Sequence, residues 1–278
     1  MLPCAPPSSE LADLLALSLE AGREILDIYR TDFAVELKAD ASSVTEADRR
    51  AEAVILAGLA KLHPGIPVVA EEEVSAGRVP DMGDDFFLVD PLDGTREFVS
   101  RNGEFTVNIA RIRNGHPVLG VIHAPVLGLA YAGAQGQGAF KAQVNGERRL
   151  APPCPIGVRP APRNGLAVIG SRSHGAAQTQ AWLARYPVSS FVSIGSSLKF
   201  CIVAEGGADL YPRLGRTMEW DTAAGDAILR AAGGLVLDLG GAPLAYGKGS
   251  AADPASYSNP HFVAYGDPSL ARTAFPAL

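Results

Sequence analysis

Two aspartates three residues apart are the first residues of this chain whose spacing could do chemistry. Asp90 and Asp93 lie in the motif Asp90-Pro91-Leu92-Asp93-Gly94-Thr95, directly after the apolar run 86–89. We expect a strand that ends in a tight turn at residues 90–95, where Gly94 allows a backbone conformation that a side chain would resist. Carboxylates hold hard cations, and free backbone N–H groups hold anions. Because Pro, Asp and Gly also dominate ordinary turns, the motif alone leaves a metal-and-phosphate site and a plain turn equally open.

Further acidic residues are expected at comparable places, at a strand end or at a helix start. Glu71 follows the apolar strand 67–70, and Asp221 opens a helix in the second half of the chain. If these acids met the pair at 90 and 93, all four would raise one another's pKa values unless a divalent cation were present. An all-oxygen site suits Mg²⁺, whereas Zn²⁺ would need His or Cys ligands. Each acid alone is also consistent with a solvated surface carboxylate or, at Asp221, with a helix cap.

A second anion-binding place is expected where Gly195-Ser196-Ser197 starts a helix. The N–H groups of a helix start attract anions, and Lys199 adds a full positive charge close behind them. Arg213 lies at a strand end shortly before Asp221 and could reach the same cleft, and His174 lies in a Ser/Gly turn after a strand. Such features are common in proteins without a ligand, so alone they indicate little.

Asp48 has a complete structural explanation. Thr45 fits the N-cap of a helix that stops before His63, and Asp48 occupies the third helical position of a capping box. Without further observations, capping is the favoured interpretation of Asp48.

The elements around these residues predict an α/β fold, one unit spanning residues 1–278 in two packed halves. In the N-terminal half, 1–155, we expect α+β structure, with a helix from Ser8 or Ser9 to Tyr29, a strand at 33–38 and an antiparallel meander within 106–141. In the C-terminal half, 156–278, strands alternate with helices, which is typical of an α/β arrangement. The Pro-rich stretch 151–164 is expected to connect the two halves.

Composition narrows the classes of function. Across 278 residues, the hydrophobic content of 47% and charged content of 19% are those of an ordinary globular protein. A net charge of −6 disfavours a nucleic-acid partner. Cys4, Cys154 and Cys201 form neither a disulfide framework nor a zinc motif, and we see no signal peptide and no transmembrane stretch. These features predict a cytoplasmic protein, and they leave peripheral association with the inner membrane face open.

Three separated motifs, in order along nearly the whole chain, resemble the inositol monophosphatase superfamily of Mg²⁺-dependent, lithium-sensitive phosphatases. They are Glu71-Glu72 after a buried strand, the 90–95 motif, and Trp220-Asp221-Thr222-Ala223-Ala224-Gly225. Residues 195–201, 204–206, 210–213 and 219–225 look most like the branch of CysQ-type 3'(2'),5'-bisphosphate nucleotidases. The resemblance implies a layered αβαβα sandwich of the inositol monophosphatase and sugar phosphatase type, with the site at the junction of the two halves.

The resemblance also implies roles for individual residues. Metal ligands, for two or three Mg²⁺ ions, would be Glu71, Asp90, Asp93, Asp221 and the backbone carbonyl of Leu92. The amides of Gly94 and Thr95 would hold the phosphate that is cleaved. Thr95 and Asp48 would relay a proton from the attacking water, which turns Asp48 from a cap into a catalytic partner. The residues that would contact the nucleotide and its spared phosphate are His174, Ser196, Lys199 and Arg213. Asp93 and Asp221 would also belong to the substrate contacts, and Glu71 to the catalytic residues.

The expected reaction is hydrolysis of the 3'-phosphate of adenosine 3',5'-bisphosphate (PAP), with its sulfated analogue PAPS as a second substrate and a role in sulfate assimilation. Inositol-specific relatives place an acid where this chain has Arg213, and an arginine there favours an additional phosphate. Arg96-Glu97-Phe98 departs from the Thr-Asn-Phe often seen after the Asp-Gly-Thr core. The alternatives are an inositol-1-monophosphatase, a fructose-1,6-bisphosphatase, or a non-catalytic phosphate sensor. The protein would be a monomer or a homodimer.

Overall fold

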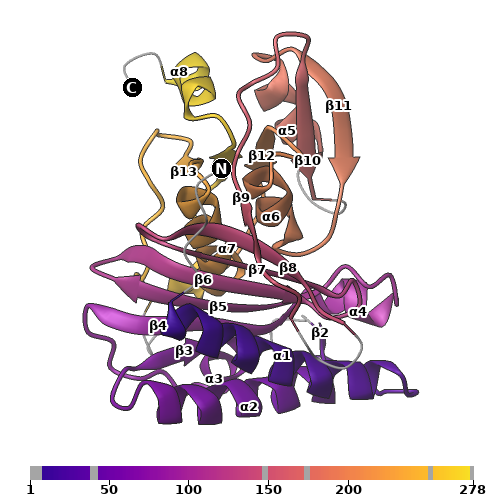
Figure 1. The fold of residues 1–278 in the computed structure, drawn as a ribbon, viewed down its shortest axis with the longest axis vertical. Coiled ribbons are helices and arrows are strands. Elements are labelled where there is room, and N and C mark those ends of the chain that lie inside the picture. Colours follow the sequence, from indigo (N-terminus) through magenta and orange to yellow (C-terminus); the bar gives the residue numbers. More distant parts are fainter. Residues whose placement is uncertain (1–7, 38–42, 146–149, 172–175, 250–252, 276–278) are drawn as a thin grey trace.

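The computed structural model describes residues 8–37, 43–145, 150–171, 176–249 and 253–275 of the chain. Its elements form five layers, helix, sheet, helix, sheet, helix, as Figure 1 shows. The first layer holds α1 (Ser9–Tyr29) and α2 (Glu46–Leu62), which lie on one face of a seven-stranded sheet. The layer between the two sheets holds α6 (Leu198–Ala204) and α7 (Glu219–Ala231). The predicted αβαβα sandwich is thereby confirmed.

The seven-stranded sheet runs in the order β3-β4-β5-β6-β7-β8-β9. Its strands β4 to β9 form an antiparallel meander, and β3 pairs in parallel with β4. The turn Asn114-Gly115 joins β5 to β6 with positive φ at both residues, as a tight hairpin requires. The strand bounds are β3 Val68–Ala70, β4 Asp85–Asp93, β5 Thr106–Arg113, β6 His116–Ala124, β7 Leu129–Ala134, β8 Gly138–Gln143 and β9 Cys154–Ile156.

The five-stranded sheet runs in the order β11-β10-β12-β14-β13. Strands β10, β11 and β12 are parallel, and β14 pairs antiparallel with both β12 and β13. Helices α5 (Ala176–Leu183) and α8 (Ala271–Ala274) share a core with the outer face of this sheet. The strand bounds are β10 Leu166–Gly170, β11 Val188–Ser193, β12 Leu210–Arg213, β13 Leu235–Asp238 and β14 Phe262–Tyr265. Short elements complete the fold: β1 Glu36–Leu37, β2 Ser43–Val44, α3 Glu71–Ser75, α4 Thr95–Val99 and the 3₁₀ turns Pro254–Tyr257 and Pro268–Leu270.

Helix α7 lies unusually close to the seven-stranded sheet. A Cβ atom built on Gly120 would lie 2.3 Å from the carbonyl oxygen of Ala224, and one on Gly133 would lie 2.8 Å from Cα of Ile228. No side chain fits there, so helix and strand backbones touch directly. The position of α7, which carries Asp221, is therefore set against β6 and β7, in the same sheet as β4, which carries Asp90 and Asp93.

Several element boundaries differ from the sequence-based expectations. The turn expected at 90–95 is wrong in part, because β4 continues to Asp93 and only Gly94 turns, at φ 96°. The strand accommodates Pro91 at a register shift between Asp90 and Asp93, where no ladder hydrogen bond is needed from its nitrogen. The expected connector 151–164 contains β9, which adds an edge strand to the first sheet. The strand expected at 33–38 is described only as β1.

The structure also describes the helices and two of the cysteines on which the sequence-based expectations about membrane spans and disulfides rest. Within the described ranges, no helix combines the length and apolar character that crossing a bilayer requires. Cys201 is buried and Cys154 is exposed, and both are free thiols.

Candidate active site

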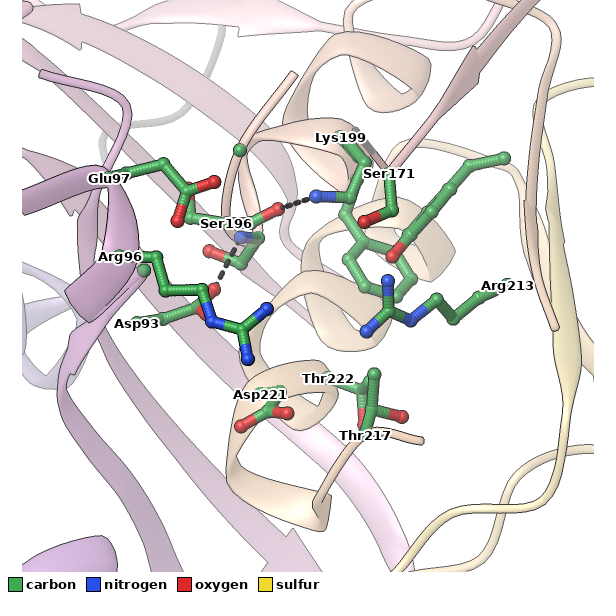
Figure 2. A pocket seen from close by; sticks show the side chains of 15 residues that line it. Asp93, Arg96, Glu97, Ser171, Ser196, Lys199, Arg213, Thr217, Asp221 and Thr222 are labelled. Atoms are coloured by element: carbon green, nitrogen blue, oxygen red, sulfur yellow. Dashed lines mark hydrogen bonds between the residues drawn. The ribbon is translucent and has the colours of Figure 1, made fainter. Parts of the chain in front are cut away.

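A cleft of about 120 Å³ lies where the two halves of the chain meet. Figure 2 shows that β4 and α4 contribute Asp93, Arg96 and Glu97 to one wall. The other wall comes from the C-terminal half, with Lys199, Arg213 and Asp221 among its side chains. The predicted site residues that line this cleft are Asp93, Gly94, Ser196, Lys199, Arg213 and Asp221.

The register of two neighbouring strands places Glu71 beside Asp90. Ala70, the last residue of β3, pairs with Val89 in the parallel strand β4, so the next residue of each strand is an acid. Asp90 is 1% exposed, and its carboxylate accepts a hydrogen bond from the backbone N–H of Leu92 at 3.0 Å. The expectation that two strand ends bring acids to one sheet edge is thereby confirmed.

The acids influence one another's protonation. Burial, followed by the charges of Glu71, Asp93 and Asp221, raises the pKa of Asp90 well above its usual value. Burial and the charge of Asp93 raise the pKa of Asp221. Burial raises the pKa of Asp93, and the charge of Lys199 opposes that rise. Acids held this close are stable as carboxylates only with positive charge nearby.

The donor set fits a hard cation that keeps water in its coordination shell. Among the described residues, no three His, Cys, Asp or Glu side chains form a group that could hold a metal ion by themselves. Mg²⁺ usually keeps several waters and binds to one or two carboxylates together with substrate phosphates, rather than in a cage made only of protein. A divalent ion would also reverse the local preference for protonation that the acids create. The residues therefore suit Mg²⁺ with open coordination positions.

Gly94 and Thr95 follow Asp93 at the start of the five-residue helix α4. Gly94 adopts φ 96°, and a Cβ there would lie 3.2 Å from the carbonyl oxygen of Glu104. A side chain at this position would be strained and crowded, so glycine is required for the turn. The assignment of the Gly94 and Thr95 amides to the cleaved phosphate stays a prediction.

Asp48 makes the capping contacts that its position predicts. Its carboxylate accepts from the backbone N–H of Thr45 at 2.8 Å and from the Thr45 hydroxyl at 2.7 Å. The Thr45 hydroxyl in turn accepts from Ala47 N, which completes the start of α2. Asp48 is 2% exposed. The capping role is confirmed, and the relay between Asp48 and Thr95 stays a prediction.

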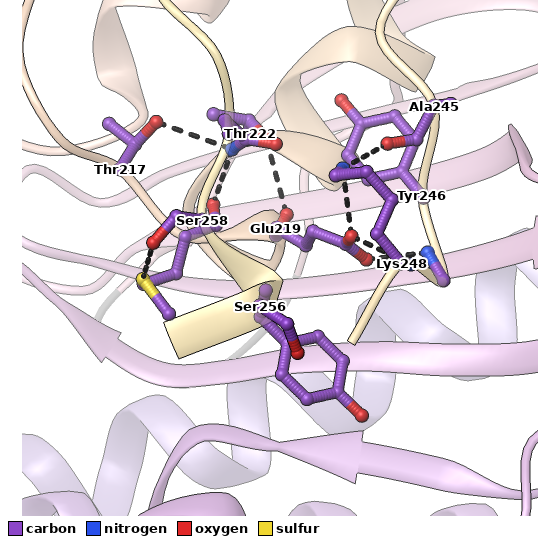
Figure 3. Close-up of polar contacts among 12 residues, drawn as sticks. Thr217, Glu219, Thr222, Ala245, Tyr246, Lys248, Ser256 and Ser258 are labelled. Atoms are coloured by element: carbon purple, nitrogen blue, oxygen red, sulfur yellow. Dashed lines mark hydrogen bonds and ion pairs between the residues drawn. The ribbon is translucent and has the colours of Figure 1, made fainter. Parts of the chain in front are cut away.

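Asp221 sits in a frame of hydrogen bonds at the start of α7. Its carboxylate accepts from Met218 N at 2.9 Å, the capping contact expected of an acid in the first turn. Asn259 donates to the Met218 carbonyl at 2.7 Å and to the Thr222 hydroxyl at 2.9 Å. The fully buried Glu219 accepts from the backbone N–H groups of residues 247 and 248, as Figure 3 shows in part. This frame fixes Asp221 at the start of α7.

Lys199 lines the cleft and also holds part of its wall, and its contact with the substrate stays a prediction. The side chain is 4% exposed, and its ammonium group donates to the carbonyl of Ile194 at 3.1 Å and to the carbonyl of Ser196. Burial lowers its pKa to about 8. Lys199 therefore holds the 194–196 turn while lining the cleft. Ser196 adopts φ 50°, which is uncommon for a residue with a side chain and is typical of constrained sites.

The two other basic residues predicted to contact the substrate are Arg213 and His174. Arg213 points into the cleft and donates from Nη2 to the carbonyl of Arg216 at 2.9 Å, whereas its Nε is buried without a hydrogen-bond partner in the described part of the chain. His174 lies outside the described residues.

Sequence reasoning missed Glu52, which supports the segment that carries Glu71. Glu52 is 3% exposed, and its two carboxylate oxygens accept from Glu72 N at 2.9 Å and Glu73 N at 3.0 Å. Burial, with the charge of Glu72 among the smaller causes, raises its pKa to about 8. A signal was present, because Glu52 falls one turn after Asp48 on the buried face of α2.

The chain matches known proteins over most of its length. A model of the inositol monophosphatase family matches residues 8–265. The 3'(2'),5'-bisphosphate nucleotidase CysQ of Shigella flexneri is 48% identical over 238 residues, which cover 85% of this chain and 93% of the relative. The solved structure of CysQ from Bacteroides thetaiotaomicron gives a TM-score of 0.76 at 38% identity, over 93% of this chain and 97% of that chain. The IMPase of Thermotoga maritima gives a TM-score of 0.74 at 27% identity, over 96% of both chains.

Proposed function

Because this chain belongs to the inositol monophosphatase family, we propose that it is a 3'(2'),5'-bisphosphate nucleotidase that converts adenosine 3',5'-bisphosphate to AMP and phosphate. The observation that carries the choice of substrate is Arg213 in the cleft wall opposite Asp93. Its planar fork suits a phosphate group, and a bisphosphate nucleotide offers one phosphate to be cleaved and one to be bound. The sulfated analogue PAPS carries the same phosphate, so the enzyme would serve PAP removal in sulfate assimilation.

Members of the family are generally metal-dependent, and the proposed cofactor here is two or three Mg²⁺ ions. The proposed ligands are Glu71, Asp90, Asp93, Asp221 and the carbonyl of Leu92. Bound Mg²⁺ would lower the pKa of a water molecule and neutralise the charge that develops on phosphate oxygens. Burial and the neighbouring acids raise the pKa values of Asp90 and Asp221, which supports this assignment because a bound cation would favour their charged forms.

The chain's own residues would position the reacting groups. In this proposal the N–H groups of Gly94 and Thr95 hold the cleaved phosphate in line with the attacking water. The Thr95 hydroxyl takes a proton from that water and passes its own proton to Asp48, whose carboxylate already accepts from Thr45. The oxygen of that water forms a bond to phosphorus while the bond from phosphorus to the 3'-oxygen breaks, and the 3'-oxygen takes a proton from solvent. Positioning and charge neutralisation together supply most of the rate in such reactions.

The test compares phosphate release from three compounds with Mg²⁺ present: adenosine 3',5'-bisphosphate, inositol 1-phosphate and fructose 1,6-bisphosphate. The proposal expects kcat/KM to be highest for the nucleotide. A preference for inositol 1-phosphate or fructose 1,6-bisphosphate would overturn the nucleotidase assignment while leaving the family membership intact. Absence of turnover on all three compounds would count against an active phosphatase altogether.

Two further proposals concern the whole protein. We propose that it is cytoplasmic, with peripheral contact to the inner membrane face as a second location, and that it is a monomer or a homodimer. Fractionation of cells and light scattering after size exclusion test these points separately from the chemistry.

A further inference from the structure

Arg96 projects into the cleft without an ion pair to any described residue. It is the second residue of α4, directly after Thr95, and it is exposed. Figure 2 shows its side chain reaching over Asp93 towards the opposite wall. Across the described residues its guanidinium makes no hydrogen bond or ion pair. By contrast, Arg78 and Arg159 each form a two-pronged pair with a carboxylate.

Arg213 faces Arg96 from the other wall. Its Nε is buried and has no hydrogen-bond partner in the described part of the chain. A buried N–H of a charged group that lacks a partner is costly, and such groups in native proteins usually mark a missing ligand or water. Nη2 makes a single hydrogen bond, to the Arg216 carbonyl, and the guanidinium group points into the cleft.

Two guanidinium groups that converge on one space repel each other unless an anion lies between them. Arg213 already acts on its surroundings, since its charge contributes to the lowered pKa of Lys199. A phosphate offers three terminal oxygens and can accept paired hydrogen bonds from two guanidinium forks at once. Arg96 and Arg213 are therefore placed to bind one phosphate group between the two walls of the cleft.

This place differs from the one assigned to the cleaved phosphate. The cleaved phosphate is proposed to lie at the backbone amides of Gly94 and Thr95, beside the acids of β4. The guanidinium of Arg96 stands at the end of a long side chain that reaches over Asp93 towards Arg213. The phosphate between the two arginines would be the second one, on the other side of the ribose.

We propose that Arg96 joins Arg213 in binding the phosphate that is not cleaved, which makes Arg96 a specificity-determining residue for bisphosphate nucleotides. This inference rests on the proposed function, because it requires a substrate with two phosphates. It assigns a role to the position at which the chain departs from the expected Thr-Asn-Phe.

The test compares kcat/KM on adenosine 3',5'-bisphosphate and on adenosine 3'-monophosphate, which lacks the spared phosphate. Arg96→Gln keeps much of the side-chain length and removes the charge. We expect this variant to lose about 10- to 100-fold on the bisphosphate, the range for a charged hydrogen-bonding pair, and to change little on the monophosphate. Arg96→Lys should fall between wild type and Arg96→Gln, since lysine keeps the charge but not the fork. Arg272→Gln, an exposed arginine on α8, should match wild type on both compounds.

Product inhibition supplies a second measurement on the same variants. AMP carries only the spared phosphate, and inorganic phosphate reports the place of the cleaved one. We expect Arg96→Gln to raise the inhibition constant of AMP and to leave that of phosphate unchanged. Equal losses on both substrates, no loss on either, or a raised constant for inorganic phosphate alone would each overturn the inference. Wild-type turnover of the bisphosphate would in those cases leave the proposed function standing, whereas its absence would refute that function first.

Discussion

The carboxylate of Asp93 accepts a hydrogen bond from the backbone N–H of Ser197, 104 positions later in the chain. Ser197 is 2% exposed, and its hydroxyl donates to Asn108 Oδ1 at 2.8 Å. An acid at the end of β4 is thus oriented by the residue that precedes α6. The wall proposed to bind metal and the wall proposed to choose the substrate are therefore joined by direct hydrogen bonds.

Replacing Asp93 by asparagine tests its proposed role in metal binding. Asn keeps an oxygen that can accept from Ser197 N, so the contact between the walls should survive. The loss of the negative charge should lower kcat by at least about 100-fold, the scale on which electrostatic groups in an active site act. Steady-state turnover and the Mg²⁺ concentration for half-maximal rate are the measurements, with circular dichroism to confirm folding. Asp13→Asn, an exposed change on α1, is the control, and unchanged turnover in Asp93→Asn would refute the assignment.

Glu52→Gln tests whether the support under Glu71 matters for metal binding. Glutamine offers one acceptor oxygen where Glu52 uses two, and its amide nitrogen would face the N–H of Glu72 or Glu73. We expect Mg²⁺ affinity to fall about 10- to 100-fold, which is typical when a residue that orients a metal ligand through hydrogen bonds is replaced. Calorimetric titration with Mg²⁺ alone gives a readout that does not depend on turnover.

The control for Glu52 is Glu46→Gln, an exposed change in the first turn of the same helix. If Glu52 served only to stabilise the fold, Glu52→Gln would lower the unfolding temperature and leave the Mg²⁺ affinity as it is. That outcome would contradict a positioning role.

His123 should make the protein less stable at acidic pH. The ring is 3% exposed, with Nδ1 at 3.0 Å from the Ser18 carbonyl, and burial lowers its pKa from 6.5 to about 4. Between these values the unfolded chain binds a proton that the folded chain does not. Stability from this group is therefore complete above pH 6.5 and declines as pH falls towards 4, by about 3 kcal/mol in total.

Urea unfolding at a series of pH values between 7 and about 4 measures that decline. In His123→Gln the group no longer titrates, so the fall in stability over this range should be shallower than in wild type. His261→Gln, which changes an exposed histidine, should retain the wild-type slope. Parallel slopes for wild type and His123→Gln would show that other groups govern the acid response.

Gly120→Ala tests the direct contact between α7 and the sheet. The added Cβ would lie 2.3 Å from the Ala224 carbonyl oxygen, so α7 has to shift and carry Asp221 with it. We expect a loss of about 1–3 kcal/mol, as for other overpacked cores, together with a lower kcat. The matched control is Gly83→Ala, because a Cβ there meets no atom within 4 Å. Wild-type kcat in a folded Gly120→Ala protein would show that the position of α7 is not critical.

Sequence reasoning succeeded where a rule about strand ends applied. Glu71 and Asp90 were expected at one sheet edge because each follows a buried strand, and the register Ala70 to Val89 makes them neighbours. It was wrong in part about the turn at 90–95, because the register shift that lets Pro91 remain in β4 depends on the partner strand β5. Which strand pairs with which is decided by the tertiary structure, and a local sequence pattern does not contain that information.

The supporting residues were harder to predict than the acids themselves. Glu52, Glu219 and Asn259 have no motif of their own, and their importance lies in which backbone groups come within reach after folding. The Arg96 side chain likewise reaches into a cleft that forms only when the two halves of the chain meet. The sequence gives the residue type at position 96, but it does not give the direction of the side chain.

At Gly120 and Gly133 no side chain lies between α7 and the sheet. The spacing of the acids and the choice of substrate can therefore change independently on mutation. Backbone contact sets how far apart Asp90 and Asp221 lie, so that spacing does not depend on which side chains line the cleft. Residues such as Arg96 and Arg213 can then be exchanged without altering the spacing of the acids. Redesign of substrate preference should therefore be possible on this scaffold through the cleft side chains alone, with the hydrolytic machinery inherited unchanged.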